Sequence, residues 1–335
     1  MTKLGEWRHR VRTRNEAQVD VLAAVAAKPL VEAVPTTGPV SDALYARLSA
    51  VDVARLEAAL EGNMRLLWDD LDEGDRHRLL LSAAAFYQDP EALKAIGLTS
   101  AEPPDDVHAM ARGPLAHGGD LGIADMVVRT LEDARVAIPA GGTLLDFGCS
   151  SGRVLRPLAA WRPDLNCIGC DPNGDAITWA QQAVPDLRWF QSPLRPPLEP
   201  CDDASVDVAF AISIWSHFSA DAALDWLGEM HRIIKPGGAL LLTTHGLNTF
   251  AEYTRGGLMD RAIMARTIGT VLTDGIEFID VFGEAGDWGV KDPDWGNSFL
   301  LADWLVEHAT PQWSIRLLRS GRLEGNQDAY VLERT

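Results

Sequence analysis

A glycine- and serine-rich turn at residues 148–152 is the first feature of this sequence that could do chemistry. The apolar run 143–147 before it predicts a short buried strand, and the pattern of 153–161 after it predicts a helix. Glycine lets a backbone come close to a ligand, and the start of a helix offers free N–H groups. A strand, such a turn and a helix in this order are typical of a site for a nucleotide-like ligand.

The spacing of the glycines and a nearby carboxylate argue against a dinucleotide as that ligand. A dinucleotide-binding dehydrogenase would carry the pattern GxGxxG, which seats a pyrophosphate on the helix start. Here the turn has Gly148, Ser150 and Gly152, with no glycine at 151 or 153. Asp146 precedes the turn by two residues, and its negative charge would oppose a pyrophosphate. We therefore disfavour that class.

The same turn also matches GxSxG, the nucleophile elbow of α/β-hydrolases, with Ser150 as the nucleophile. Asp207 and His245 follow in the order that such a triad requires. A nucleophile elbow normally follows several strands, however, and here about 100 residues of helical pattern come first. No HGGG-type oxyanion segment precedes it either. A hydrolase that uses Ser150 is therefore the weaker alternative.

A site for S-adenosylmethionine accounts for the carboxylates on both sides of the turn. Asp146 would accept hydrogen bonds from the ammonium end of that ligand, because a carboxylate suits a cationic group. The turn would lie beneath the amino-acid portion and the ribose. The next predicted strand ends at Asp171, one β-α-β step further on, where an acidic residue can take both ribose hydroxyls.

Four segments together resemble the signature motifs of class I S-adenosylmethionine-dependent methyltransferases. They are the first motif at 144–153, the second at 168–172, the fourth-strand motif at 205–213 and the Lys-Pro-Gly-Gly crossing into the fifth strand at 231–242. The resemblance covers roughly residues 115–247, and Ser150 stands where the first motif commonly has glycine.

Two further segments narrow the resemblance. Residues 213–218 and the ending 326–332 are similar to bacterial methyltransferases of small molecules and glycans, which are often encoded beside glycosyltransferases. This second resemblance rests on shorter motifs than the first.

The resemblance implies a set of cofactor-binding residues. Ser192 should meet the adenine edge, while Ser213 and Trp215 should lie beside the methionine portion, although packing alone could equally explain Trp215. The full set expected to contact S-adenosylmethionine is Asp146, Gly148, Cys149, Ser150, Gly152, Asp171, Pro172, Ser192, Ser213 and Trp215.

Three histidines are candidates for a catalytic base. Methyl transfer from a sulfonium is an in-line displacement, so alignment supplies much of the catalysis, and an oxygen acceptor also benefits from a base near neutral pKa. His245 follows the fifth predicted strand, at the edge where ligands bind in such sheets, and could be catalytic or structural. His217 opens the helix after the fourth strand, where related methyltransferases of different chemistries often carry histidine, so we favour a structural role for it. His117 precedes the predicted sheet.

An aromatic-rich segment, residues 248–311, is too long for a plain connection between strands. Its aromatic side chains could pack a small subdomain or line an acceptor pocket, and the sequence leaves both interpretations open. The aromatic residues are Phe250, Tyr253, Phe278, Phe282, Trp288, Trp295, Phe299 and Trp304.

The order of predicted elements indicates an α/β fold. Alternating short apolar strands and helices predict a doubly wound, mostly parallel, Rossmann-like sheet of seven strands, closed by an antiparallel C-terminal hairpin. Residues 1–105 have helical patterns, including a helix capped by Ser41 and Asp42, and form an N-terminal region with a lid, acceptor or dimerisation role. Residues 106–335 form the methyltransferase domain, with 248–311 as an acceptor-side insertion.

Charge and cysteine content exclude other classes. The net charge of −18 argues against nucleic acid as a partner, because phosphate binding draws on Lys and Arg. The arginine-rich stretch 8–14 fits a solvated terminus better than a nucleic-acid arm. Cys167 and Cys170 form a CxxC pair, but a strand would turn them to opposite faces and no further ligands follow, so we expect no metal.

These observations lead to one functional expectation. We expect a cytoplasmic enzyme without a signal or membrane segment, and a homodimer is possible. It would transfer a methyl group from S-adenosylmethionine to a small-molecule acceptor, with a hydroxyl of a sugar or secondary metabolite as the expected group. The alternative from another class is a non-catalytic S-adenosylmethionine-binding protein.

Overall fold

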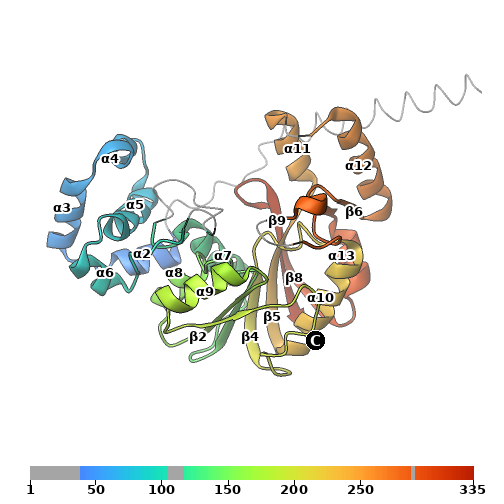
Figure 1. The fold of residues 1–335 in the computed structure, drawn as a ribbon, viewed down its shortest axis with the longest axis horizontal. Coiled ribbons are helices and arrows are strands. Elements are labelled where there is room, and N and C mark those ends of the chain that lie inside the picture. Colours follow the sequence, from blue (N-terminus) through green and yellow to red (C-terminus); the bar gives the residue numbers. More distant parts are fainter. Residues whose placement is uncertain (1–37, 105–106, 108–116, 258, 288–290) are drawn as a thin grey trace, which may run out of the picture.

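The computed structural model describes residues 38–104, 107, 117–257, 259–287 and 291–335 (Figure 1). The strands are β1 (Thr143–Phe147), β2 (Asn166–Asp171), β3 (Arg188–Gln191), β4 (Val206–Ala211), β5 (Ile234–His245), β6 (Ile276–Ile279), β7 (Asn297–Leu300), β8 (Trp313–Leu323) and β9 (Gln327–Arg334). The helices are α2 (Pro39–Tyr45), α3 (Ala50–Ala59), α4 (Gly62–Trp68), α5 (Glu73–Phe86), α6 (Pro90–Ile96), α7 (Leu121–Asp133), α8 (Leu155–Trp161), α9 (Gly174–Ala183), α10 (Ala220–Ile233), α11 (Leu247–Gly256), α12 (Arg261–Asp274) and α13 (Ala302–Ala309), with a 3₁₀ turn, η2 (Gly283–Ala285).

One sheet organises the molecule, and its central strands run parallel in the order β3-β2-β1-β4-β5. Strand β9 pairs antiparallel with β5 and with β8, which is the hairpin expected at the C-terminus. The predicted fold class is thereby confirmed. The sheet has nine strands instead of seven because β6 and β7 arise within the segment 248–311, and β7 joins β5 through a single pair, His245 with Phe299.

Alternating side chains bury both faces of this sheet. In β1, Leu144 belongs to the core on the side of α7, α8 and α9, whereas Leu145 belongs to the core on the side of α10 and α13. Strand alternation explains this division, because successive side chains point to opposite faces. The same rule separates Cys167 from Cys170, which lie in different cores, and all four cysteines are free and buried.

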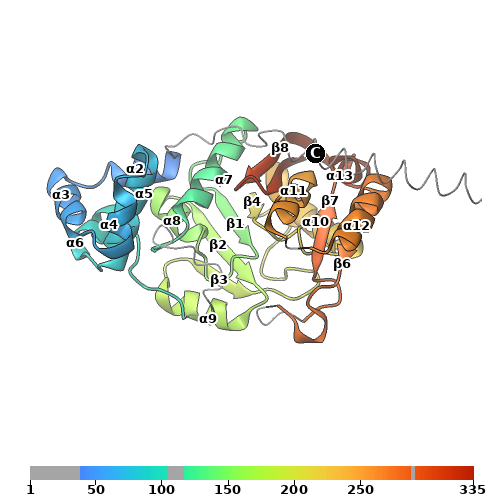
Figure 2. The same cartoon turned by 90° about the horizontal axis from the view of Figure 1, so that it is seen from above.

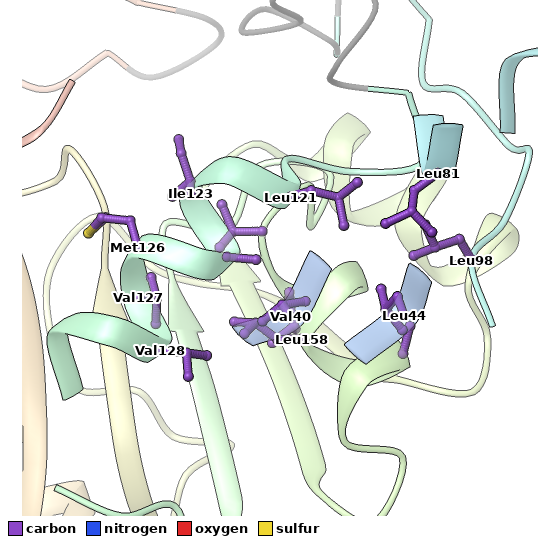
Figure 3. Packing of buried hydrophobic residues seen from close by; sticks show 14 of the residues in the cluster. Val40, Leu44, Leu81, Leu98, Leu121, Ile123, Met126, Val127, Val128 and Leu158 are labelled. Carbon is purple, nitrogen blue, oxygen red and sulfur yellow. The ribbon is translucent and has the colours of Figure 1, made fainter. Parts of the chain in front are cut away.

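Helices α2–α6 gather at one end of the molecule, and α11 and α12 at the other (Figure 2). The N-terminal helices contact the sheet domain through a shared apolar core. Figure 3 shows Val40 and Leu44 of α2 beside Leu121 and Val127 of α7 and Leu158 of α8. Burial of these side chains joins the N-terminal helices to the Rossmann-like layer.

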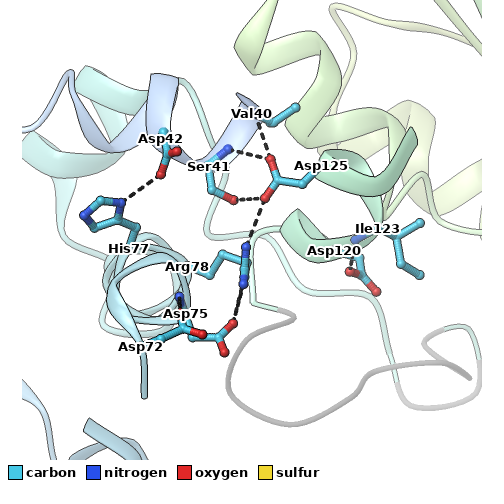
Figure 4. Close-up of polar contacts among 10 residues, drawn as sticks. All are labelled: Val40, Ser41, Asp42, Asp72, Asp75, His77, Arg78, Asp120, Ile123 and Asp125. Carbon is cyan, nitrogen blue, oxygen red and sulfur yellow. Dashed lines mark hydrogen bonds and ion pairs between the residues drawn. The ribbon is translucent and has the colours of Figure 1, made fainter. Parts of the chain in front are cut away.

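A carboxylate of the sheet domain caps the first described helix (Figure 4). The N-cap of α2 is Gly38, so the expected cap at Ser41 and Asp42 is wrong. Asp125 of α7 instead accepts from the backbone N–H groups of Val40 and Ser41 at 2.8 and 2.9 Å, and from the Ser41 hydroxyl. A helix start leaves N–H groups unsatisfied, and here a residue 85 positions away supplies the acceptor.

The arginine-rich stretch 8–14 and the first part of the region 1–105 lie outside the described residues. Among the helices that are described, none combines the length and apolarity that crossing a bilayer requires. The division at 105/106 stays a prediction.

Candidate active site

A cavity of about 390 Å³ opens at the carboxyl ends of the parallel strands. Its walls come from the segments that follow β1, β2, β3 and β4, and from the segment between β6 and β7. Ligands bind at this edge in doubly wound sheets, because the loops there converge beside the point where the strand order reverses. This cavity contains most of the residues selected from the sequence.

The glycine-rich turn after β1 needs its glycines for conformation and packing. Gly148 and Gly152 have φ values of +80° and +73°, which favour glycine. A Cβ on Gly148 would lie 2.1 Å from the Ile214 side chain, and one on Gly152 would lie 2.2 Å from the Trp189 ring. Ser150 also has a positive φ, at 49°. The turn is therefore shaped by neighbouring side chains before any ligand arrives.

Asp171, at the end of β2, holds this turn in place. Its carboxylate accepts from the backbone N–H of Ser150 at 2.7 Å and from that of Asn173 at 2.8 Å. Burial raises the pKa of Asp171, and these two backbone hydrogen bonds oppose the rise. A carboxylate fixed by backbone donors at the cavity wall still has lone pairs for a ligand's hydroxyl groups.

Asp146, at the end of neighbouring β1, is almost completely buried and lines the same cavity. Its Oδ2 atom has no hydrogen-bond partner among the described residues. Burial first, and then the nearby Asp171, raise the pKa of Asp146 well above its ordinary value. A buried carboxylate without a partner is costly, so this oxygen marks a place for a cationic donor from a ligand.

The other expected cofactor residues divide into two groups. Cys149, Pro172, Ser192 and Ser213 line the cavity together with Gly148 and Ser150, whereas Gly152, also in the turn, does not line it. Trp215 does not line it, because the ring is fully buried and packs against neighbouring aromatic rings. Packing therefore accounts for Trp215, and the expectation that it lies beside the ligand is not supported.

The three candidate histidines occupy different environments. His217 lines the cavity, and its Nδ1 lies 2.6 Å from the carbonyl oxygen of Gly296. His245 lies behind it with a ring-to-ring distance of 6.2 Å, is buried, and does not line the cavity. Burial lowers the pKa of His245 to about 3. His117 is remote from both and lies 3.4 Å from Glu102.

The wall beside His217 is aromatic and acidic. Trp295 stacks on the His217 ring with centroids 4.6 Å apart, and Phe282 lies 6.1 Å from it. The Trp295 indole donates to Asp287 at 3.0 Å. Arg195 binds both Asp292, at 2.6 and 2.9 Å, and Asp294.

Other aromatic residues of the segment 248–311 pack the insertion and the sheet. Phe250 and Phe299 stack 4.5 Å apart in a small separate core, and Trp304 belongs to the core under α10 and α13. Trp288 lies outside the described residues. The aromatic residues of this segment therefore divide between packing and the cavity wall, where Phe282 and Trp295 lie, and their contact with an acceptor stays a prediction.

A serine-hydrolase triad does not assemble. Asp207 lies near the start of β4, where it binds Lys235 at 2.8 Å and the backbone N–H of Thr143 at 2.8 Å. Ser150 and His245 both follow the carboxyl ends of their strands, at the opposite edge of the sheet. The order in the sequence was therefore compatible with a triad, but the topology separates its members.

Several residues at the site were missed from the sequence, Asp287 among them, and two others show why. Arg153, the last residue of the first motif, lines the cavity and binds Asp120 at 2.8 Å. Gln327, in the C-terminal motif, donates to the Ser213 hydroxyl at 2.6 Å. Arg153 could have been found from the motif boundary. Gln327 could not, because its role depends on a contact with Ser213, 114 positions away.

The fold and the cavity define a Rossmann-like cofactor-binding domain whose buried carboxylates suit a cationic ligand with ribose hydroxyls. A family model described as a methyltransferase domain matches residues 144–238. These residues therefore form a class I S-adenosylmethionine-dependent methyltransferase domain, as the motifs predicted, and S-adenosylmethionine is the cofactor of this class.

Curated relatives match the same part of the chain. Trans-aconitate 2-methyltransferase of Azoarcus sp. is 32% identical over 124 residues, which are 36% of this chain and 47% of the relative. The cyclopropane mycolic acid synthase MmaA2 of Mycobacterium bovis is 28% identical over 148 residues, which are 40% of this chain and 48% of the relative. The chain thus spans about half the length of these relatives.

Solved structures also resemble this chain. A SAM-dependent methyltransferase from Aquifex aeolicus aligns over 70% of this chain and 100% of its own, with 14% identity and a TM-score of 0.42. The cyclopropane synthase MmaA2 from Mycobacterium tuberculosis aligns over 63% and 84%, with 16% identity and a TM-score of 0.41.

Proposed function

We propose that this protein transfers the methyl group of S-adenosylmethionine to a small-molecule acceptor, and that the methylated group is a hydroxyl of a sugar or secondary metabolite. The observation that carries the proposal is that one cavity joins the buried Asp146 and the half-buried Asp171 to the ring of His217. The proposed cofactor site and a neutral base thus share one cavity, which is what proton-coupled methyl transfer requires.

The cofactor fits the residues of the inner wall of the cavity, which is the part beside Asp146 and Asp171. S-adenosylmethionine supplies a methyl group activated by a positively charged sulfur. Asp146, whose Oδ2 lacks a partner among the described residues, would hold the ammonium group, and Asp171 would receive the ribose hydroxyls. Arg153 lines the same space and suits a carboxylate. The ammonium and the carboxylate of the ligand would then each meet a group of opposite charge.

His217 is our proposed base. A carbonyl oxygen only accepts hydrogen bonds, so Nδ1 of His217 carries the hydrogen in its contact with Gly296, and Nε2 keeps a free lone pair. Burial lowers the pKa of His217, which keeps the ring neutral near pH 7, while the charge of Asp287 acts in the opposite direction. Nε2 would accept the proton of the acceptor hydroxyl, and Asp287 would stabilise the imidazolium that results.

The outer wall of the cavity is the part beside His217. Its side chains favour an acceptor of limited size. Phe282 and Trp295 offer aromatic surface, and Asp287 offers an acceptor for hydroxyl groups. A cavity of about 390 Å³ suits a small ligand beside the cofactor. The net charge of −18 supports a partner other than nucleic acid. A cytoplasmic location, and a homodimer formed by the N-terminal helices, stay parts of this proposal.

An acceptor screen tests the proposal. The full-length protein is incubated with labelled S-adenosylmethionine and a panel of sugars, phenols, amines and carboxylic acids, and products are identified by a mass increase of one methyl group. We expect a hydroxyl-bearing acceptor to be methylated. Exclusive methylation of amines or carboxylates would contradict the hydroxyl assignment.

The same screen distinguishes the alternatives. A non-catalytic binding protein would bind S-adenosylhomocysteine and yet methylate no acceptor. A hydrolase would cleave ester substrates and lose that activity in Ser150→Ala. The separation of Ser150 from Asp207 in the fold disfavours the second alternative.

A further inference from the structure

A closed ring of hydrogen bonds lies beside the cavity and connects three segments of the sheet. The backbone N–H of Ser213, after β4, donates to the Thr243 hydroxyl at 2.8 Å. The Thr243 hydroxyl, on β5, donates to Oε1 of Gln327 at 2.7 Å. Nε2 of Gln327, on β9, donates back to the Ser213 hydroxyl at 2.6 Å. Thr243 and Gln327 are both buried.

The direction of each bond in this ring follows from the orientation of the Gln327 amide. Its Oε1 only accepts, so the Thr243 hydroxyl, which accepts from the Ser213 N–H, directs its own hydrogen to Gln327. Its Nε2 only donates, so the NH₂ end of the amide donates to the Ser213 oxygen. The Ser213 oxygen is therefore an acceptor within the ring, and its own hydrogen stays available.

Among the described residues, one contact competes for that hydrogen. The Ser216 hydroxyl lies 3.4 Å from the Ser213 oxygen, well beyond the usual distance of about 2.7–2.8 Å for such a pair. Ser213 lines the cavity and has a φ of +64°, a conformation that the ring helps to hold. The side chain is thus a fixed donor at the cavity wall.

We propose that Gln327 is a positioning residue that holds the Ser213 hydroxyl as a hydrogen-bond donor toward the carboxylate of the bound cofactor. This inference rests on the proposed function. Strand β1 lies between β2 and β4, so Asp146 lies between Asp171 and Ser213 along the sheet edge. The ammonium and carboxylate of an amino acid share one carbon atom, so an ammonium at Asp146 brings the carboxylate within reach of the next strand end.

Comparing the binding of two ligands distinguishes this positioning role of Gln327 from a purely structural role. S-adenosylhomocysteine contains the amino-acid portion, and 5′-methylthioadenosine lacks it while keeping the adenosine. Their dissociation constants are measured by calorimetry for the full-length protein and for Ser213→Ala, Gln327→Glu and the double variant. At a pH where it is ionised, the carboxylate introduced by Gln327→Glu only accepts hydrogen bonds, so it would draw the Ser213 hydrogen into the ring and away from the ligand.

We expect each single variant to bind S-adenosylhomocysteine about tenfold to hundredfold more weakly, the usual loss for a hydrogen bond to a charged group. Binding of 5′-methylthioadenosine should stay within about twofold. The double variant should bind S-adenosylhomocysteine no more weakly than Ser213→Ala, because Gln327 acts through Ser213. Gln312→Glu places the same new charge at an exposed position and should change neither constant.

Three results would contradict the positioning role of Gln327. Equal weakening of both ligands would indicate a structural role, and additive losses in the double variant would show that Gln327 does not act through Ser213. If Gln327→Glu fails to fold, Gln327→Met replaces it, and an unchanged affinity for S-adenosylhomocysteine in that variant would reject the proposal. If the unmodified protein binds neither ligand, the proposed function itself fails.

Discussion

The inner wall of the cavity, beside Asp146 and Asp171, comes from loops that directly follow neighbouring strands, whereas the outer wall, beside His217, joins segments far apart in the sequence. The bond between Ser150 and Asp171 spans 21 residues, and that between His217 and Gly296 spans 79. The inner wall therefore forms within one β-α-β unit, while the outer wall exists only when the insertion packs against the end of β4.

This difference indicates a division of labour. The inner wall has two neighbouring carboxylates and a turn with positive φ values, and its shape is set by short-range hydrogen bonds, which would suit a fixed cofactor. The outer wall has aromatic and acidic side chains from the insertion, which can vary without disturbing the sheet. Four experiments test whether the two walls are independent.

The largest effect is expected at His217. In His217→Gln, the rate of methyl transfer should fall about 10²–10⁴-fold, the range for loss of a general base. The affinity for S-adenosylhomocysteine should change by less than about threefold, because the ring belongs to the outer wall. Turnover is measured with an acceptor from the screen, and affinity by calorimetry. A parallel loss of both would show that the walls are coupled.

The inner wall is tested by Asp171→Ala. This change leaves the N–H groups of Ser150 and Asn173 without their acceptor and removes the proposed ribose ligand. We expect about tenfold to hundredfold weaker binding of S-adenosylhomocysteine. Asp175→Ala, at an exposed position of the next helix, is the matched control and should bind normally. Full affinity in Asp171→Ala would refute the assignment of the inner wall.

The pH dependence of cofactor binding isolates Asp146. Its pKa is raised in the unliganded protein by burial and by Asp171, so the protonated form persists to higher pH than in an ordinary aspartate. An ammonium ligand requires the carboxylate, so binding should release protons and tighten as the pH rises, by up to about tenfold per pH unit below that pKa. Calorimetry in buffers of different ionisation enthalpy measures the release. Asp146→Asn should show a smaller pH dependence, and an unchanged one would contradict the assignment.

The smallest effect on the reaction is expected at His245. His245→Leu should alter turnover by less than about threefold, because the ring does not line the cavity. Its folded-state pKa of about 3 is below the ordinary value, so the unfolded chain binds the proton more readily. The unmodified protein should therefore lose stability as the pH falls below about 6.5, by at most about 1.4 kcal/mol per pH unit from this group.

Denaturant unfolding between pH 4 and pH 7 checks this expectation. The variant should show a flatter dependence of the unfolding free energy on pH than the unmodified protein. A large loss of turnover in His245→Leu with normal cofactor affinity would instead make His245 the base and reverse the roles of the two histidines.

Local patterns in the sequence were sufficient to predict the seven strands outside the segment 248–311, the glycine-rich turn and the positions of Asp146 and Asp171 at strand ends. Short apolar runs, positive-φ positions and capping residues act over a few neighbouring residues, so they can be read without the fold. These patterns gave a wrong prediction where the contact that determines the structure joins residues far apart in the sequence. Ser41 has the chemistry of a helix cap, but Asp125 of another helix satisfies the start of α2.

Within the site, the sequence by itself determined that Asp146, Asp171 and Ser213 lie close together, because they stand at or after the ends of parallel strands that share one edge. Only the tertiary structure decided that His217 rather than His245 lines the cavity, that Trp215 belongs to the core, and that Gln327 reaches Ser213. These outcomes depend on how the insertion and the C-terminal hairpin pack onto β5. Such packing joins residues 79 and 114 positions apart, and no local propensity encodes it.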